Sequence, residues 1–150
     1  MKGICGKLLE IDLTSGKTES TLISDEMVEK YLGGRGLGAR LLFDSLPAKT
    51  DPLSPENVLI FLTGPLTGSM VTGSSKFVVV TKSPLTHGWC DSYSSGRIAL
   101  ELKKAGYDGM MIRGRSNHPC YLRINEHGVE VRGAGSLWGK DSFETERMLK

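Results

Sequence analysis

The chain has 150 residues, which suits a single domain with a moderate hydrophobic core. Hydrophobic residues make up 39% of the composition, and 19 basic against 17 acidic residues leave a formal net charge of +2. This balance, without a run of Lys and Arg, argues against a nucleic-acid partner. No apolar run is long enough for a membrane span and no signal-peptide core follows the start, so we expect a cytoplasmic protein without a membrane partner.

The three cysteines, Cys5, Cys90 and Cys120, are far apart and odd in number. There is no Cys-x-x-Cys pair, so the sequence specifies no zinc or iron–sulfur site of its own, and we expect three reduced thiols. The histidines fall in predicted loops, and no Ser–His–Asp arrangement is indicated. We therefore predict neither a catalytic residue nor a metal ligand in this chain.

Alternating or wholly apolar residues in the first half of the chain predict four strands, at 7–13, 18–23, 58–63 and 76–82. Ser24 is expected to cap a helix, because acidic residues fill the turn that follows it. The Gly33-Gly34 pair interrupts this helix, and a second helical stretch stops before Pro47.

In the second half, Ser94-Ser95-Gly96 is expected to open a helix that ends at Gly106. Three further strands, two of them joined in a hairpin, are predicted at 109–113, 120–125 and 129–132. Hairpins with few helices indicate an α+β fold, and the similar halves suggest an internal duplication. The helix-like segment Ser142–Lys150 lacks a C-cap, so we expect residues 1–150 to be one domain excised from a longer protein.

Two glycine-rich segments in the first half could bind an anion. Gly33–Gly38 looks like a phosphate loop, but a helix rather than a strand precedes it, so we interpret it as a break between packed helices. Gly64–Gly68 and Thr72–Lys76 combine free backbone N–H groups, hydroxyls and the Lys76 cation, which suits a phosphate or a pterin ring. The alternative for this second region is a polar surface loop.

A third segment, Asp91–Arg97, is interpreted as a polar loop that feeds directly into a helix. Backbone N–H groups at a helix start attract anions, and Ser94 or Ser95 could bind one or cap the helix. An ordinary N-cap is the alternative here. The residues alone therefore indicate an anion-binding α+β domain.

Five blocks of residues indicate a more specific assignment than an anion-binding domain. They are Leu32–Leu37, Asp51–Asn57, Thr63–Gly68, Val80–Thr86 and Glu101–Asp108. Together with Leu137–Lys140 and Glu144–Glu146 they resemble the N-terminal domain of the aldehyde ferredoxin oxidoreductase family over nearly the whole chain. One Gly-Pro-Leu-Thr-Gly block alone would be weak evidence. Five blocks in the family's order, with similar spacing, are a specific match.

The resemblance implies a domain of two β-sheets with pseudo-twofold symmetry, which forms a base beneath a tungsten or molybdenum atom bound by two pterins. It implies an enzyme that oxidises aldehydes to carboxylic acids and passes the electrons to ferredoxin or another electron-transfer protein. C-terminal domains outside these residues would hold a [4Fe–4S] cluster, and magnesium would bridge the pterins. The resemblance is also compatible with a homodimer.

By the same resemblance, Lys76 stands where the family usually has an Arg that reaches a pterin phosphate. Lys keeps the charge but lacks the bidentate fork of Arg. The family's Asn-Ser-Gly-Gly pattern occurs here as Tyr93-Ser94-Ser95-Gly96, and Tyr93 cannot supply the amide carbonyl of Asn. We predict that Lys76 and Ser75, together with Tyr93-Ser94-Ser95-Gly96, bind the cofactor, and that the two departures mark a divergent branch.

Two other functions stay open at this point. The chain could be a separately encoded module that carries or scaffolds the pterin without catalysis, and a reading frame ending at Lys150 would favour this. It could also belong to a relative that reduces aromatic thioesters, because the substrate cavity would lie mostly outside these residues.

Overall fold

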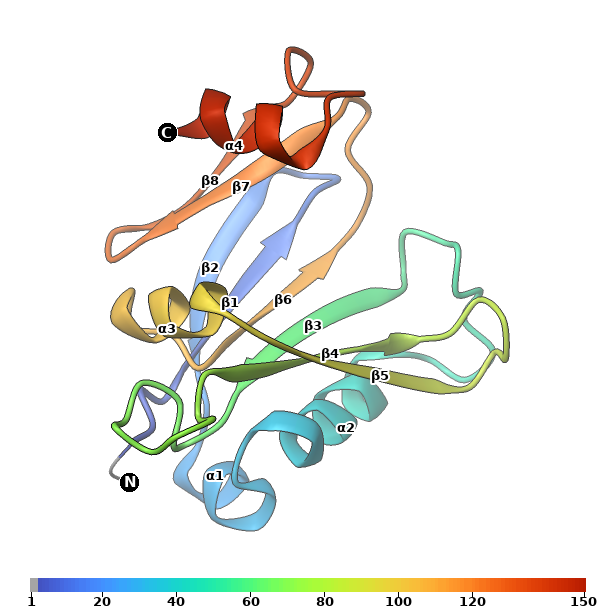
Figure 1. Cartoon of the computed structure of the whole chain (residues 1–150). Coiled ribbons are helices and arrows are strands. Elements are labelled where there is room, and N and C mark those ends of the chain that lie inside the picture. The colour runs from blue at the N-terminus through green and yellow to red at the C-terminus, as the bar shows by residue number, and fades with distance from the viewer. Residues whose placement is uncertain (1–2) are drawn as a thin grey trace.

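The computed structural model describes residues 3–150 and consists of two β-sheets and four helices (Figure 1). The strands are β1 (Lys7–Asp12), β2 (Lys17–Leu22), β3 (Val58–Thr63), β4 (Lys76–Lys82), β5 (Trp89–Ser95), β6 (Gly109–Arg113), β7 (Cys120–Asn125) and β8 (Gly128–Gly133). The helices are α1 (Asp25–Tyr31), α2 (Gly34–Ser45), α3 (Arg97–Lys104) and α4 (Ser142–Leu149). The predicted α+β class with two sheets is confirmed. No helix within these residues is long and apolar enough to cross a membrane.

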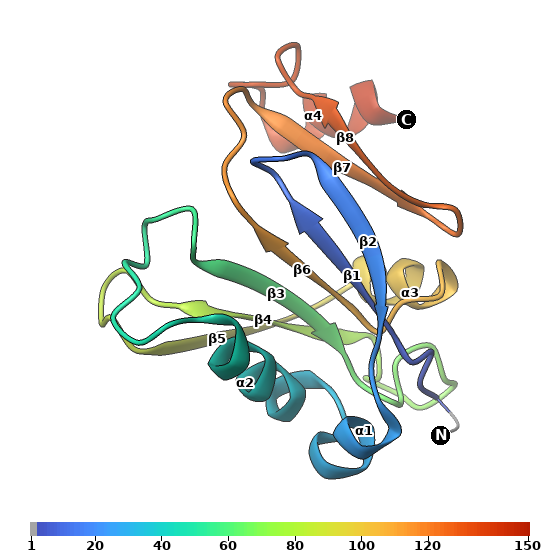
Figure 2. The ribbon, with the colours of Figure 1, turned by 180° about the vertical axis from the view of Figure 1, so that it is seen from behind.

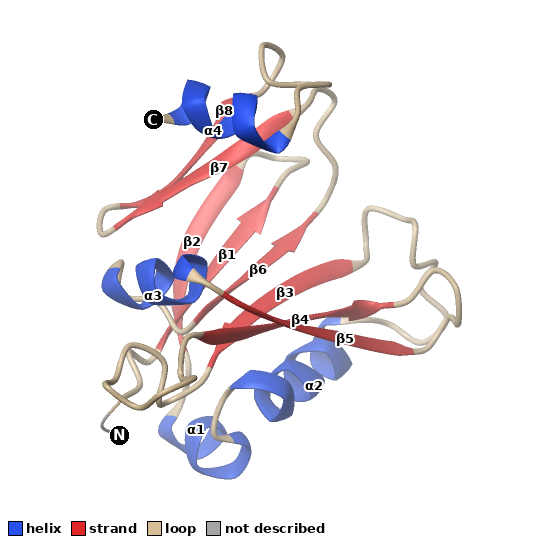
Figure 3. Cartoon of the chain, in the orientation of Figure 1, coloured by secondary structure: helices blue, strands red, loops and turns tan. Residues whose placement is uncertain are grey.

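The larger sheet has six strands in the order β2-β1-β6-β3-β4-β5, and β7 pairs with β8 in a separate hairpin. Only β1 and β6 run parallel, and every other pair is antiparallel. Figure 3 shows that the sheet twists strongly between β2 at one edge and β5 at the other. Two distant parts of the sequence, β1–β2 and β3–β5, are joined through β6.

One face of this sheet is covered by α1 and α2. Ser24 caps α1 as predicted, because its hydroxyl accepts a hydrogen bond from the backbone N–H of Met27 at 3.2 Å. Gly38 lets α2 approach the sheet closely, since a Cβ there would lie 2.8 Å from a methyl of Val80. The apolar residues that meet on this face are Leu8, Leu37, Leu42, Val58, Ile60, Leu62, Val78, Val80 and Met111.

The other face is covered by α3 and by the β7–β8 hairpin, which lie in front of the sheet in Figure 1, whereas α1 and α2 lie in front in the view from behind (Figure 2). A second apolar cluster lies there, formed by Leu9, Ile11, Leu102, Tyr107 and Met110. The hairpin contributes partly buried residues to it, namely Leu122, Ile124 and Val129. The accessible parts of the sheet are its loops and its two edge strands, β2 and β5, whose residues are mostly exposed.

A buried carboxylate fixes the start of the chain to the end of α3. Asp108, only 3% exposed, accepts hydrogen bonds from the backbone N–H groups of Cys5 at 3.1 Å and Gly6 at 2.6 Å. It also forms an ion pair with Lys103, whose ammonium donates to the carbonyl of Gly3 at 2.8 Å. These contacts bring residues 3–6 beside the Gly64–Gly68 loop, where the carbonyl of Pro65 lies against Gly3.

The structure corrects the prediction for the segment that precedes α3. Residues 91–95 belong to strand β5 and not to a polar loop, and they pair with β4. The N-cap of α3 is Gly96, whose φ of 124° suits glycine, and no side chain caps the helix. The expectation that Ser94 or Ser95 caps α3 is therefore wrong. The predicted internal duplication stays a prediction.

Candidate functional site

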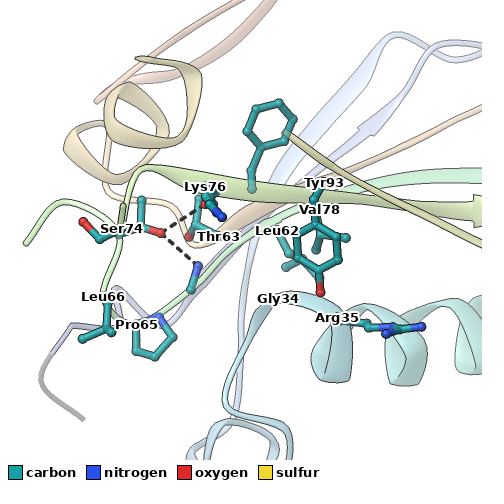
Figure 4. Close-up of a pocket in the computed structure, with 13 residues that line it drawn as sticks. Gly34, Arg35, Leu62, Thr63, Pro65, Leu66, Ser74, Lys76, Val78 and Tyr93 are labelled. Atoms are coloured by element: carbon teal, nitrogen blue, oxygen red, sulfur yellow. Dashed lines mark hydrogen bonds between the residues drawn. The ribbon is translucent and has the colours of Figure 1, made fainter. Parts of the chain in front are cut away.

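A hollow of about 250 Å³ lies where the first turn of α2 meets the ends of β3 and β4. Figure 4 shows the side chain of Tyr93 extending from β5 toward Gly34 and Arg35 of α2, across the mouth of this space. The lining residues come from parts of the chain that are far apart in sequence: Gly34, Arg35, 62–67, Ser74, 76–78 and Tyr93.

The inner wall of the hollow is apolar. Leu62 and Val78 come from neighbouring strands and are each 1% exposed. Pro65 and Leu66 extend the wall along the loop that leaves β3, and Leu66 is 57% exposed. Such a wall can cover the face of a planar ring, since pockets for small molecules combine apolar surface with a few placed polar groups.

The first turn of α2 supplies the polar side of the hollow. Its N-cap is Gly33, with a φ of 121°, and no side chain caps the helix. The N–H groups at the start of an α-helix have no partner inside the helix, and the helix dipole makes this end positive. A Cβ on Gly33 would lie 3.2 Å from the carbonyl oxygen of Thr63, so glycine lets the uncapped turn pack against the end of β3.

The Gly64–Gly68 loop is held by hydrogen bonds within the fold. The Thr67 hydroxyl accepts from the N–H of Gly64 at 3.1 Å and donates to the carbonyl of Lys76 at 3.3 Å. Thr67 itself is buried, so its hydroxyl serves the loop and does not offer a donor to an anion, which corrects the expectation for this residue. The loop is therefore a fixed wall of the hollow and not an isolated surface loop.

The β4–β5 ladder brings the predicted binding residues together. Lys76 pairs with Ser95 across the two strands, and Val78 pairs with Tyr93. Because side chains alternate along a strand, these four residues share one face of the sheet. Of the residues predicted to bind a cofactor, Lys76 and Tyr93 line the hollow.

The remaining predicted residues lie beside the hollow and not in its wall. The Ser75 hydroxyl donates to the carbonyl of Gly96 at 2.6 Å, and the Gly96 N–H donates to the carbonyl of Ser75 at 3.2 Å. Ser94 pairs with Phe77, so its side chain belongs to the opposite face from Lys76. Ser75 and Gly96 thus fix the join between β4 and α3, and their role toward a ligand stays a prediction.

Sequence reasoning missed Gly34 and Arg35, which the fold places at the hollow. The sequence predicts a helix break at this segment, and the structure confirms it: α1 ends at Tyr31 and α2 begins at Gly34. A signal was nevertheless present. No Ser, Thr, Asp or Asn precedes α2 at the cap position, whereas Ser24 precedes α1, and an uncapped helix start followed by Arg favours an anion.

Comparison with known families gives one match over nearly the whole chain. A family model described as "Aldehyde ferredoxin oxidoreductase, N-terminal domain" matches residues 8–150. Among the described residues, 3–150, no group of three or more His, Cys, Asp or Glu side chains could hold a metal ion. The three cysteines are free thiols.

Similar proteins with names are oxidoreductases, in agreement with the family match. The chain is 44% identical over 150 residues to a "Tungsten-containing aldehyde ferredoxin oxidoreductase" of Pyrococcus horikoshii. It is also 44% identical over 147 residues to an "Aliphatic sulfonate oxidoreductase, WOR-like subunit" of Pyrococcus furiosus. The chain spans about a quarter of the length of these relatives: 25% of the first and 23% of the second.

A solved structure has the same fold. It is titled "Active site complex BamBC of Benzoyl Coenzyme A reductase in complex with 1,5 Dienoyl-CoA", and it superposes with a TM-score of 0.95 at 42% identity. The match covers 99% of the present chain and 23% of the other.

Proposed function

The chain belongs to the family of aldehyde ferredoxin oxidoreductase N-terminal domains, and from this membership we propose that it is the cofactor-binding domain of an oxidoreductase. The proposed enzyme oxidises aldehydes to carboxylic acids and passes the electrons to ferredoxin. Its cofactor is a tungsten centre held by pterins. Tungsten is favoured over molybdenum because the named aldehyde-oxidising relatives are tungsten-containing.

The observation that carries the proposal is the composition of the hollow. It combines an apolar wall with an uncapped helix start and the cationic side chain of Lys76. A pterin with a phosphate group has the matching parts: a planar ring for the apolar wall and a dianion for the N–H groups and the cation. The residues present therefore fit the group that family membership implies.

Each part of the hollow has a role in this proposal. The backbone N–H groups at Gly34 and Arg35 and the ammonium of Lys76 bind the phosphate, and the apolar surface of Pro65 and Leu66 covers the ring. Tyr93 lies at the mouth and limits the access of water to the phosphate. When bound, the metal centre supplies the two-electron oxidation, and this domain supplies binding, orientation and electrostatics.

The rest of the enzyme is proposed to lie outside these residues. By family membership, a [4Fe–4S] cluster that carries electrons to ferredoxin and a magnesium ion between the pterins complete the cofactor set. We propose the cytoplasm of an anaerobic organism as its setting, since such a reduced metal centre requires the absence of oxygen.

A second candidate function is the reduction of an aromatic thioester. The solved structure with a TM-score of 0.95 belongs to a benzoyl coenzyme A reductase, and its 42% identity is close to that of the aldehyde-oxidising relatives. The hollow supports both candidates equally, because it concerns the cofactor and not the substrate.

The first experiment is metal analysis of the full-length gene product, purified without oxygen, together with fluorescence of the released and oxidised pterin. About one tungsten atom and roughly two pterins per chain are expected from the family's cofactor. Lys76→Ala should then lower the pterin content, while Lys82→Ala, on the same strand but outside the hollow, should not. Absence of both metal and pterin from the properly folded wild-type protein would refute the proposal. Activity with an aldehyde or with an aromatic thioester then separates the two candidates.

A further inference from the structure

The side chain of Tyr93 projects from the edge strand β5 over the hollow. Its partner across the ladder is Val78, and Lys76 lies two residues before Val78 on the same face of β4. Figure 4 shows the ring of Tyr93 crossing the mouth of the hollow, with its hydroxyl directed at the first turn of α2 near Gly34. Tyr93 is 57% exposed, so a small ligand can reach this hydroxyl.

Four hydroxyl groups line the hollow, and the fold already uses three of them. Each of these three donates to a backbone carbonyl: Thr63 to Asp108 at 2.8 Å, Thr67 to Lys76 at 3.3 Å and Ser74 to Ser69 at 3.3 Å. Among the described residues, the hydroxyl of Tyr93 has no hydrogen-bond partner. A phenol is neutral at pH 7 and carries one proton to donate. Of the four hydroxyls, only that of Tyr93 is therefore free to donate to a ligand.

The charges around the hollow favour an anion beside this hydroxyl. No acidic residue is found among the described residues that line the hollow. Arg35 is engaged elsewhere, because its Nε pairs with Asp91 at 3.4 Å and Figure 4 shows its guanidinium directed along α2. Lys76 is therefore the side-chain cation that the hollow offers to a ligand, and it lies on the strand next to Tyr93.

We infer that the hydroxyl of Tyr93 donates a hydrogen bond to the phosphate group of the ligand, which lies between this hydroxyl and the ammonium of Lys76. Diagonal neighbours on adjacent strands are within reach of each other's long side chains, so the two residues can contact one anion. A hydrogen bond from a hydroxyl to an anionic oxygen is short and strong. The inference rests on the proposed function, and it gives the hydroxyl a role that is separate from the covering role of the ring.

The hydroxyl and the ring of Tyr93 can be separated by two substitutions. A ring that only obstructed the hollow would compete with phosphate, so Tyr93→Phe would leave the affinity for phosphate unchanged and Tyr93→Ala would raise it. A hydroxyl that donates to phosphate strengthens binding, so both substitutions lower the affinity. The direction of the change in each variant therefore reports which part of the side chain acts on the ligand.

The test measures the binding of inorganic phosphate to the full-length protein produced without its cofactor, by a titration followed with phosphorus NMR. Tyr93→Phe removes only the hydroxyl, and it should weaken phosphate binding roughly threefold to thirtyfold, because a hydrogen bond to a charged group is lost. Tyr93→Ala should weaken phosphate binding at least as much. When Tyr93→Phe is combined with Lys76→Ala, the loss should be smaller than the product of the two single losses, since both groups contact one phosphate.

The matched control is Tyr121→Phe, which removes a phenol hydroxyl from β7, outside the hollow, and should leave phosphate affinity unchanged. Unchanged or tighter phosphate binding in Tyr93→Phe would overturn the inference. An equal loss in Tyr121→Phe, or losses that multiply in the double variant, would also overturn it. Pterin and tungsten in the wild-type protein keep these outcomes distinct from a failure of the proposed function, which their absence would signal.

Discussion

The ion pair between Lys103 and Asp108 offers the most direct test of how this fold is held together. The side chains are 9% and 4% exposed, and the carboxylate also accepts from the backbone N–H groups of Cys5 and Gly6. Asp108→Ala leaves the ammonium of Lys103 nearly buried with only the carbonyl of Gly3 as partner. The same change leaves two backbone N–H groups without their acceptor.

The expected loss follows from the cost of an uncompensated buried charge. Breaking a buried ion pair by removing one partner costs about 3–5 kcal/mol, and the lower figure applies here because Lys103 keeps one acceptor and an edge of solvent contact. For a chain of this size, a loss of about 3 kcal/mol lowers Tm by roughly 6–12 °C. Lys103→Met should cost less, about 2 kcal/mol, because the carboxylate still has the N–H groups of Cys5 and Gly6.

The assay is urea unfolding followed by circular dichroism and tryptophan fluorescence, for Asp108→Ala, Lys103→Met and the double variant. The double variant should lose less than the sum of the single losses, since no charge is then left without a partner. Lys104→Met is the control: Lys104 pairs with Glu101 at 3.0 Å on the exposed face of α3, and its loss should stay below about 0.5 kcal/mol. A loss below about 1 kcal/mol for Asp108→Ala, or strictly additive losses, would refute the reasoning.

Three further predictions concern pH, packing and thiol reactivity. Hydrogen bonds from the backbone N–H groups of the following turn lower the pKa of Asp12, so the unfolded chain binds more protons as the pH falls below about 5, and stability should decline there. Asp12→Asn should flatten that decline in thermal unfolding between pH 3 and 7, and an unchanged slope would contradict it. Gly109→Ala should cost about 1–3 kcal/mol in urea unfolding, because its Cβ would lie 2.4 Å from the carbonyl oxygen of Phe61, and a neutral effect would show that the two strands can separate cheaply. Burial raises the pKa of the Cys5 thiol, and the nearby Asp108 carboxylate raises it further, so alkylation of Cys5 by iodoacetamide should need a higher pH than alkylation of a cysteine in an unfolded peptide. The same dependence of alkylation rate on pH for both thiols would contradict this.

The elements that could be predicted from the sequence are those whose signals are local. The alternation in Lys7–Asp12 and the apolar run Val58–Thr63 are each sufficient to predict a strand. Ser24 marks the start of α1, because its hydroxyl caps the helix. In contrast, β5 has the sequence Trp-Cys-Asp-Ser-Tyr-Ser-Ser, which is rich in turn-forming residues and is mostly exposed. It is a strand because β4 offers a partner along its whole length, and no local pattern records that partner.

The residues of the candidate site also differ in whether the sequence alone reveals them. Lys76 and Tyr93 could be selected from the sequence because family resemblance marks their positions, and the β4–β5 register places both on the wall of the hollow. Arg35 could not be selected, because its place depends on how α2 packs on the sheet. Gly38 controls that packing from within the helix by its approach to Val80 and Leu62.

The two predicted departures from the family pattern fall at neighbouring positions of the sheet. Lys76 and Tyr93 lie on one face of adjacent strands, with Val78 opposite Tyr93 and two residues from Lys76. A phenol at position 93 reaches toward the first turn of α2, where a shorter amide would not. Both side chains line one hollow, so we expect the effects of substitutions at positions 76 and 93 on a bound ligand to be non-additive.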